Sequence, residues 1–211
     1  MIRIFSAAVC PFAQRTRALL THLGVEFELV EIDLQDKPDE FLEISPTGKV
    51  PLMESGDFVL FESQIINDYL VEKFEWSGAY PDQLEQKFRQ KLAAKQWDGV
   101  VLEPFYAGLG DPARLEEAEG EIRDVLAFIE EVFQKSASDA ENMISFHMAT
   151  HWARMGWLSE YTDLPVWIED YDALKQGLDR AVEQPAIQET LPKKEATVRI
   201  YEEHYVGEKA T

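Results

Sequence analysis

The chain has 211 residues, 45% of them hydrophobic and 11% aromatic, which suffices for one large domain or two small ones and excludes an intrinsically disordered chain. Its 40 acidic residues against 20 basic ones give a formal charge of -20, which repels nucleic acid and anionic membranes. No apolar run approaches the roughly 18 residues that a membrane span needs, so we expect a cytoplasmic protein with neither kind of partner.

The first part of the chain alternates strand patterns with helix patterns. Residues 2–5 predict a short strand, and "PFAQRTRALLTHLGV" then places apolar residues at helical spacing until Gly24. Residues 27–34 alternate with period two, and "KPDEFLEI" predicts a second helix with Pro38 in its first turn. "KVPLMES" and "FVLFES", joined by "GD", predict two more strands, and "SQIINDYLVEKF" predicts a helix. The predicted order up to residue 76 is βαβαββα.

The rest of the chain is predicted to be helical. Residues 77–82, "SGAYPD", collect Gly and Pro between two periodic stretches and predict a linker. The segments that carry the 3.6-residue period of helices are 83–109, 113–135 and 167–187. We therefore expect an α/β domain at 1–76 followed by an all-α domain at 83–211.

Cys10 is the only cysteine, and it stands at the head of the first predicted helix, with Pro11 suited to the first helical position. A lone cysteine is usually a small buried hydrophobe, but the positive end of a helix stabilises a thiolate and favours a nucleophile. No internal disulfide and no multi-cysteine metal site can form. Ala13 stands where a "CPYC" motif would carry its resolving thiol, so a redox cycle must use an external thiol.

The segment "CPFAQRTR" at residues 10–17 resembles the active-site segment of the omega-like, cysteine-type glutathione transferases. The segments that extend the resemblance over nearly the whole chain are "SPTGKVPLME" at 45–54, "FESQIINDYL" at 61–70 and "DLPVWIEDYDALKQGLDRAVEQPAIQETL" at 163–191. The resemblance implies a thioredoxin-like N-terminal domain, an all-helical C-terminal domain, glutathione as co-substrate, no metal, and a homodimer. It also makes Cys10 the catalytic residue.

The resemblance further implies which residues hold the backbone and the γ-glutamyl end of glutathione. A cis bond between Val50 and Pro51 would let Val50 offer its N–H and C=O to a peptide ligand, although most X–Pro bonds are trans. Glu62 and Ser63 would bind the γ-glutamyl end, because a helix N-terminus suits a carboxylate. Ser63 is equally well explained as an ordinary helix cap.

Two more residues are assigned to the glutathione site by the resemblance. Lys37 would meet the glycyl carboxylate, whereas its ordinary role would be that of a solvated surface lysine. Phe12 would shape the pocket wall beside Cys10, although an aromatic residue there is also explained by packing.

Residues 140–150 depart from the family pattern. A helix in the second domain usually starts with a Ser/Thr-x-x-Asp box, but here Ser145 and Met148 occupy those positions, so one cap is expected to be missing. His147 and His151 are spaced like metal ligands on a helix, yet Met148 replaces the Glu of H-E-x-x-H and no third ligand is evident. Packing is therefore the favoured role of both histidines.

These features predict a glutathione-dependent thiol transferase that catalyses deglutathionylation and dehydroascorbate-type reduction. The Cys10 thiolate would form a mixed disulfide with glutathione, taken from a small-molecule or protein substrate, and a second glutathione would release it. One alternative is a transferase that conjugates glutathione to electrophiles, with Ser6 as the candidate hydroxyl. Cys10 opposes this alternative because it would form a disulfide with the thiol it should stabilise. The other alternative is a non-enzymatic regulatory protein of the same fold.

Overall fold

The N-terminal part of the chain forms a mixed four-stranded sheet with its helices. The computed structural model describes residues 1–135, 142–159, 161 and 167–206. The first elements are β1 (Ile2–Ser6), α1 (Pro11–His22), β2 (Phe27–Glu31), α2 (Asp39–Ile44), β3 (Leu52–Ser55), β4 (Phe58–Phe61) and α3 (Ser63–Lys73). This is the predicted βαβαββα order. Pro38 is the extended residue before α2, with φ -60° and ψ 141°, and not part of its first turn as predicted.

The strands are ordered β2-β1-β3-β4 across the sheet. β1 pairs with β2 in parallel, which requires the crossover that α1 provides, and pairs with β3 in antiparallel fashion. β3 and β4 form a hairpin whose turn contains Gly56 at φ 63°, a conformation that favours glycine. β1 is therefore a central strand, and the loop that follows it leaves the sheet between β2 and β3.

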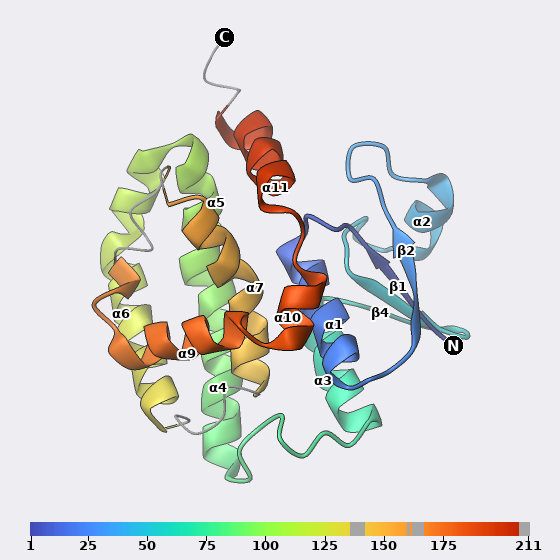
Figure 1. Cartoon of the computed structure of the whole chain (residues 1–211), viewed down its shortest axis with the longest axis horizontal. Helices are drawn as coiled ribbons and strands as arrows, with labels where there is room; N and C mark the ends of the chain where they lie inside the picture. The colour runs from blue at the N-terminus through green and yellow to red at the C-terminus, as the bar shows by residue number, and fades with distance from the viewer. Residues whose placement is uncertain (136–141, 160, 162–166, 207–211) are drawn as a thin grey trace. The chain divides into compact units, whose positions relative to one another are not determined.

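Each face of the sheet is covered by helices. Phe5, Leu52, Ile32 and Phe41 form one buried cluster, in which Phe41 comes from α2. Side chains alternate along a strand, so Ile4 points to the opposite face, where α1 and α3 lie (Figure 1). The loop that leads from β1 into α1 is thus carried by a packed core.

A segment from late in the chain joins this first unit. α10 (Pro185–Thr190) packs against α1, and Gln184–Pro192 groups with Met1–Ala79 in one compact unit (Figure 1). The division expected from the sequence places this segment in the 83–211 domain, whereas the structure groups it with the first unit. Because α10, α3 and the sheet all pack against α1, every residue from Ala13 to Leu20 is buried, the polar ones included.

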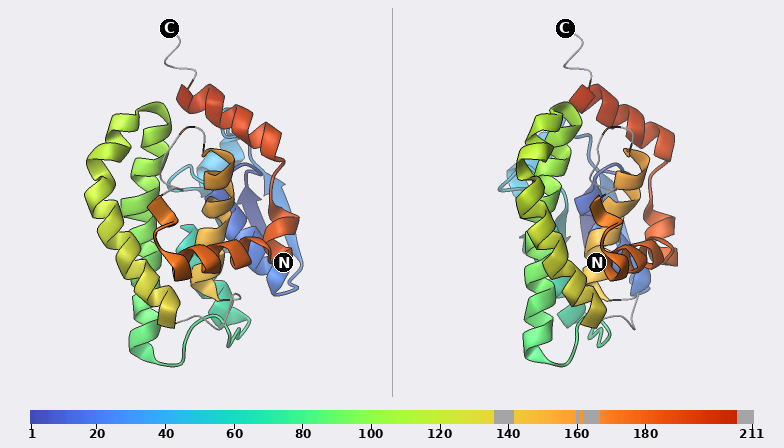
Figure 2. Two further views of the ribbon diagram at one scale, coloured as in Figure 1. Left: turned by 60° about the vertical axis from the view of Figure 1, so that its left-hand side comes forward. Right: turned by 90° about the vertical axis from the view of Figure 1, so that its left-hand side faces the viewer.

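The second unit comprises Tyr80–Glu183 and Lys193–Thr211. Its described elements are α4 (Leu84–Gln96), the π-helix η1 (Trp97–Leu102), α5 (Glu103–Gly110), α6 (Pro112–Lys135), α7 (Met143–Trp157), α9 (Asp172–Val182), α11 (Lys194–Tyr201) and the π-helix η2 (Glu202–Val206). α4, η1 and α5 follow one another in one line, and α6 runs beside them in both views of Figure 2. Within the described residues, none of the helices is long and apolar enough to cross a membrane.

The π-helical turn η1 interrupts the helix predicted over 83–109. Pro104 follows it as the second residue of α5 and lacks the N–H that a continuous α-helix would need there. A widened turn accommodates such a missing bond. The sequence keeps the helical period over 83–109 because α4, η1 and α5 follow one another in one direction.

α7 is buried over most of its length, and every residue from Met143 to His151 is buried. Its N-cap is Asn142, whose side-chain oxygen accepts the N–H of Ser145 at 3.0 Å. The expectation of a missing cap is therefore wrong, because Asn142 supplies the interaction from a position three residues before Ser145. Part of the resembling segment near the next helix, residues 163–166, lies outside the described residues.

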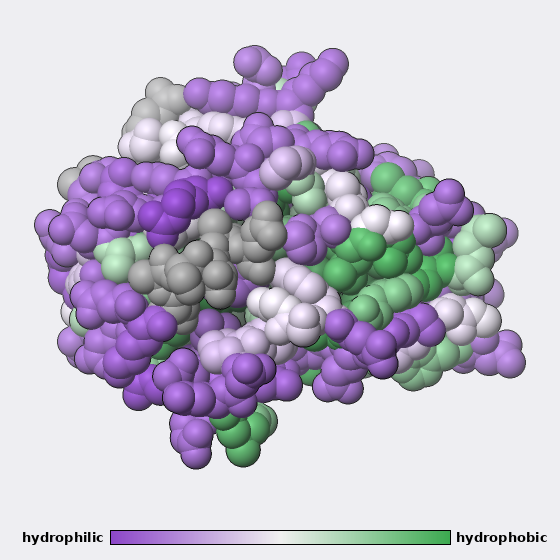
Figure 3. Space-filling model, turned by 60° about the horizontal axis from the view of Figure 1, so that its bottom comes forward, coloured by the Kyte–Doolittle hydropathy of each residue, from purple (hydrophilic) through white to green (hydrophobic). Residues whose placement is uncertain are grey.

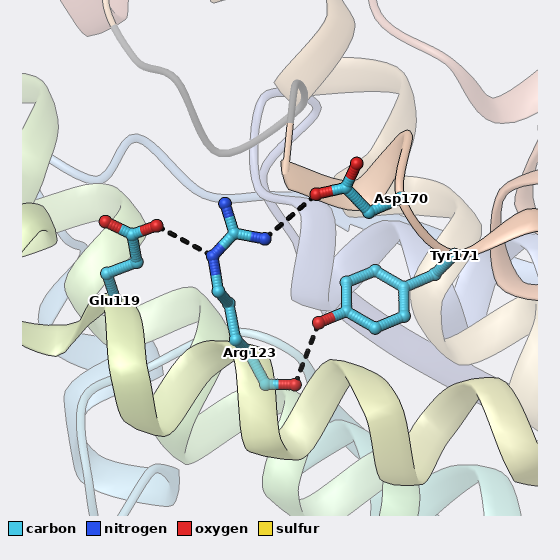
Figure 4. Close-up of polar contacts among 4 residues, drawn as sticks. All are labelled: Glu119, Arg123, Asp170 and Tyr171. Carbon is cyan, nitrogen blue, oxygen red and sulfur yellow. Dashed lines mark hydrogen bonds and ion pairs between the residues drawn. The ribbon is translucent and has the colours of Figure 1, made fainter.

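The start of α9 is held by side chains of α6. Glu130 accepts the N–H groups of Ala173 and Leu174 at 3.1 and 2.7 Å, which supplies a carboxylate to the positive end of α9. Two turns earlier on α6, Arg123 forms ion pairs with Glu119 and Asp170, and Tyr171 donates its hydroxyl hydrogen bond to the Arg123 carbonyl (Figure 4). Hydrogen bonding, first by Glu119 and then by Asp170, raises the pKa of the Arg123 guanidinium above its ordinary value.

We expect Glu130→Ala to destabilise the protein by about 1–3 kcal/mol, because two backbone N–H groups at a helix start lose a charged acceptor. Chemical denaturation measures the loss. Glu121→Ala is the matched control, since Glu121 lies exposed on the same helix. Equal midpoints for the two variants would contradict the capping role of Glu130.

Candidate functional site

Cys10 occupies the N-cap position of α1. Its backbone is extended, with φ -76° and ψ 115°, and Pro11 begins the helix as predicted. The Cys10 carbonyl accepts the N–H of Gln14 at 3.0 Å, and the Cys10 N–H donates to the Ala7 carbonyl at 3.0 Å. The side chain is half-buried and makes no capping hydrogen bond. The thiol therefore lies at the positive end of a helix without serving as its cap.

The start of β3 lies beside the thiol. The Val50–Pro51 peptide bond is cis, which confirms the expectation from the resemblance. Cys10 Sγ is 3.9 Å from the Val50 carbonyl oxygen, a weak S–H···O contact. The structure thus brings Cys10, Val50 and Pro51 together, although they are far apart in the sequence.

Ser63 is the first residue of α3 and is buried, and Glu62 before it is the N-cap. Glu62 has φ 68° and ψ 111°, a conformation that is strained for any residue except glycine. Its side chain is exposed and makes no capping bond, so the strain is not explained by local capping. Strained residues of this kind are enriched at binding sites.

Arg15 connects Phe12 with Ser63. Its Nη1 donates to Ser63 Oγ at 3.4 Å, and its guanidinium carbon lies 4.7 Å from the centre of the Phe12 ring. Phe12 and Arg15 are three residues apart and share one face of α1. Arg15 is not among the residues predicted for the site, because "QRTR" has the composition of a solvent-exposed helix face. Its spacing from Phe12 was the one available signal.

Lys37 lies apart from this group in the connection between β2 and α2. It is half-buried, and within the described part of the chain it makes no hydrogen bond or ion pair. The structure therefore does not bring Lys37 into contact with the other predicted site residues, and its role stays a prediction.

The two histidines of α7 have separate partners in the second unit. His147 Nε2 lies 3.0 Å from Asp98 Oδ1, and His151 Nδ1 lies 2.8 Å from the hydroxyl of Tyr106. Both imidazoles are buried. These contacts favour the packing role over a shared metal site.

Two solved structures share this arrangement of elements. The omega 1C glutathione transferase of Trametes versicolor aligns with a TM-score of 0.76 and 18% identity, covering 97% of this chain and 96% of that one. A tau class glutathione S-transferase of mango, Mangifera indica, aligns with a TM-score of 0.79 and 20% identity, covering 94% and 96%. The fold is therefore that of the glutathione transferases, a thioredoxin-like domain followed by a helical one.

Sequence comparison identifies the family. The family model "Glutathione S-transferase, N-terminal domain" matches residues 4–80. The mouse protein "Glutathione S-transferase omega-1" is 34% identical over 146 residues, which cover 69% of this chain and 58% of the mouse protein. "Pyrimidodiazepine synthase" of Drosophila melanogaster is 39% identical over 124 residues, covering 52% and 51%. The chain belongs to the glutathione transferase family and is omega-like. It spans about half the length of the curated relatives it matches.

Proposed function

We propose that the protein is a glutathione-dependent thiol transferase whose nucleophile is Cys10. The Cys10 thiolate attacks the glutathione sulfur of a mixed disulfide, forming a Cys10–glutathione disulfide and releasing the substrate thiolate. A second glutathione, as thiolate, then attacks the glutathione sulfur of this adduct, which yields oxidised glutathione and restores the Cys10 thiolate. Dehydroascorbate-type reduction would share only the second step. One glutathione would become bound to Cys10 as a disulfide while the substrate takes up two electrons and two protons, and the second glutathione would release it as oxidised glutathione.

The observation that carries this proposal is the position of the only cysteine. Cys10 is half-buried at the N-terminus of α1, where partial positive charge favours the thiolate over the thiol. Ala13 lies buried one turn further along the helix, so no second thiol can resolve the adduct from within. An external thiol is therefore required, and glutathione is the thiol that the family relationship supports.

Residues before β3 and at the start of α3 suit the parts of glutathione. Val50 lies before the cis bond beside the thiol and can pair with a peptide backbone through its N–H and C=O groups. Ser63, at the N-terminus of α3, can receive the γ-glutamyl carboxylate with its hydroxyl and backbone N–H. The exposed carboxylate of Glu62 can accept the ammonium group at the same end. Lys37 is the proposed partner of the glycyl carboxylate.

Conjugation of glutathione to electrophiles is the second candidate, and the geometry gives it less support. Ser6, the hydroxyl considered for that role, is fully buried at the end of β1 and accepts a hydrogen bond from Arg17. A hydroxyl held in this way is poorly placed to stabilise a bound thiolate. A regulatory protein without enzymatic activity remains the third candidate.

Paired activity measurements separate these candidates. We expect turnover of a glutathionylated peptide with glutathione to exceed conjugation of glutathione to chlorodinitrobenzene by at least about a hundredfold, because Cys10 forms a disulfide with the thiol that conjugation needs. Conjugation as the faster reaction would favour the second candidate. Glutathione binding with neither activity would favour the third.

We also propose that the protein acts in the cytoplasm as a homodimer. Leu84, Phe88 and Leu92 form a stripe on α4 that is 62%, 58% and 48% exposed. Apolar residues also gather toward the right-hand side of the face shown in Figure 3. α4 also carries four basic residues and one acidic residue, although the whole chain has a charge of -20. An apolar and basic face suits a second, acidic copy of the chain.

Phe88→Asp is expected to convert the dimer to a monomer, because it places a charge in the centre of the exposed stripe. Sedimentation velocity at physiological salt measures the change. Ile200→Asp is the control, since Ile200 is 39% exposed on α11, outside the stripe. A wild-type protein that is monomeric at high concentration would contradict the proposed assembly.

A further inference from the structure

The loop that carries Cys10 is held by a buried arginine of the following helix. Arg17 is 6% exposed, and its Nη1 donates to Ser6 Oγ and to the Ala7 carbonyl, the latter at 3.1 Å. Its Nη2 donates to the Ala8 carbonyl at 3.3 Å. Since the Cys10 N–H also donates to the Ala7 carbonyl, Arg17 and Cys10 share an acceptor. The guanidinium thus fixes the peptide groups that lead directly to the cysteine.

A carboxylate holds the same loop from the sheet. Glu31, the last residue of β2, accepts the Ala8 N–H at 2.6 Å through Oε1. Arg17 therefore binds the carbonyl groups of Ala7 and Ala8, and Glu31 binds the N–H group of Ala8. Such a loop has little freedom to rotate, so the direction of the Cys10 side chain is set before any ligand binds.

Arg17 also joins this loop to α10. Its Nη2 donates to the Thr190 carbonyl at 3.4 Å, while Gln14 Nε2 donates to the Ile187 carbonyl at 3.2 Å. One planar guanidinium therefore bridges the loop before α1 and the end of α10. A lysine could keep the charge, but its single ammonium group cannot reproduce this fork of fixed donors.

We propose that Arg17 is a positioning residue for Cys10, which sets the cysteine at the N-terminus of α1 by anchoring the Ser6–Cys10 loop to α10. This role rests on the proposed function, in which Cys10 is the nucleophile. Burial of a charged side chain is costly unless its donors are satisfied, and here backbone carbonyls and a hydroxyl satisfy them. The same contacts orient the loop that presents the thiol.

The test is the pH dependence of Cys10 alkylation by iodoacetamide, followed by intact-mass spectrometry, because this reaction needs no glutathione. In the wild type we expect the midpoint of the rate profile below the roughly 8.5 of an ordinary thiol. Arg17→Lys retains the positive charge and loses the fork, so it should raise the midpoint and lower the rate at pH 6.5 by about tenfold. Glu31→Ala should act in the same direction, because it frees the same loop.

Arg154→Lys is the matched control, since Arg154 is also a buried arginine that donates to a backbone carbonyl, that of Thr150, but lies in the second unit. Its alkylation profile should match that of the wild type. If Arg17→Lys fails to fold, Glu31→Ala decides, because Glu31 is exposed. A low wild-type midpoint that neither loop variant moves would overturn the positioning role alone. An ordinary wild-type midpoint would overturn the nucleophile itself.

Discussion

Cys10→Ser is expected to lower thiol-disulfide exchange by at least about a thousandfold while glutathione still binds. A serine hydroxyl cannot form the mixed disulfide, and it is scarcely ionised at neutral pH. The residues proposed to bind glutathione, Val50 and Ser63 among them, are unchanged by this substitution. Release of glutathione from a glutathionylated peptide measures the exchange, and titration calorimetry measures the affinity for glutathione.

A second substitution distinguishes the loss of the nucleophile from a damaged loop. Cys10→Ala removes the thiol without adding a hydroxyl, and we expect it to be as inactive as Cys10→Ser in the exchange reaction. Both variants should unfold at nearly the wild-type temperature, because the Cys10 side chain is only half-buried. Full exchange activity in either variant would contradict the assignment of Cys10.

The elements around the site follow from local sequence patterns. Alternation marks β1 and β3, and Pro11 after Cys10 marks the start of α1, because proline suits the first position of a helix and no interior one. These signals depend on neighbours in the chain, so they are visible in the sequence alone. The cis bond before Pro51 was expected from the family resemblance and not from local physics.

The contacts that complete the site could not be predicted in this way. Arg15 and Arg17 have the composition of an exposed helix face, but both are buried: Arg15 contacts Ser63 of α3, and Arg17 contacts Thr190 of α10. The local sequence of α10 does not indicate that this helix packs on α1. The cap of α7 by Asn142 and the support of α9 by Glu130 likewise depend on individual side-chain geometry, which periodicity does not report.

Mild peroxide with glutathione is expected to add one glutathionyl group to each native chain. Peroxide oxidises the Cys10 thiolate to a sulfenic acid, and glutathione then condenses with it to form a disulfide and water. Cys10 is the only cysteine, so no internal thiol can compete and no second site can be labelled. Intact-mass spectrometry counts the adducts, and treatment with a small-thiol reductant should remove them. Cys10→Ser should remain unmodified.

The same experiment tests whether the proposed glutathione site speeds the formation of the adduct. Glu62→Gln should slow adduct formation, because it weakens the proposed contact with the γ-glutamyl end, whereas Glu72→Gln on the exposed side of α3 should not. An inert, buried cysteine makes the opposite prediction, with no adduct on the native chain and labelling only after unfolding. If Glu62→Gln and Glu72→Gln formed the adduct at equal rates, Cys10 would be a reactive thiol, but the glutathione site proposed at Glu62 would be contradicted. The two properties are separable because reactivity depends on the helix N-terminus, whereas binding depends on Glu62 and Ser63.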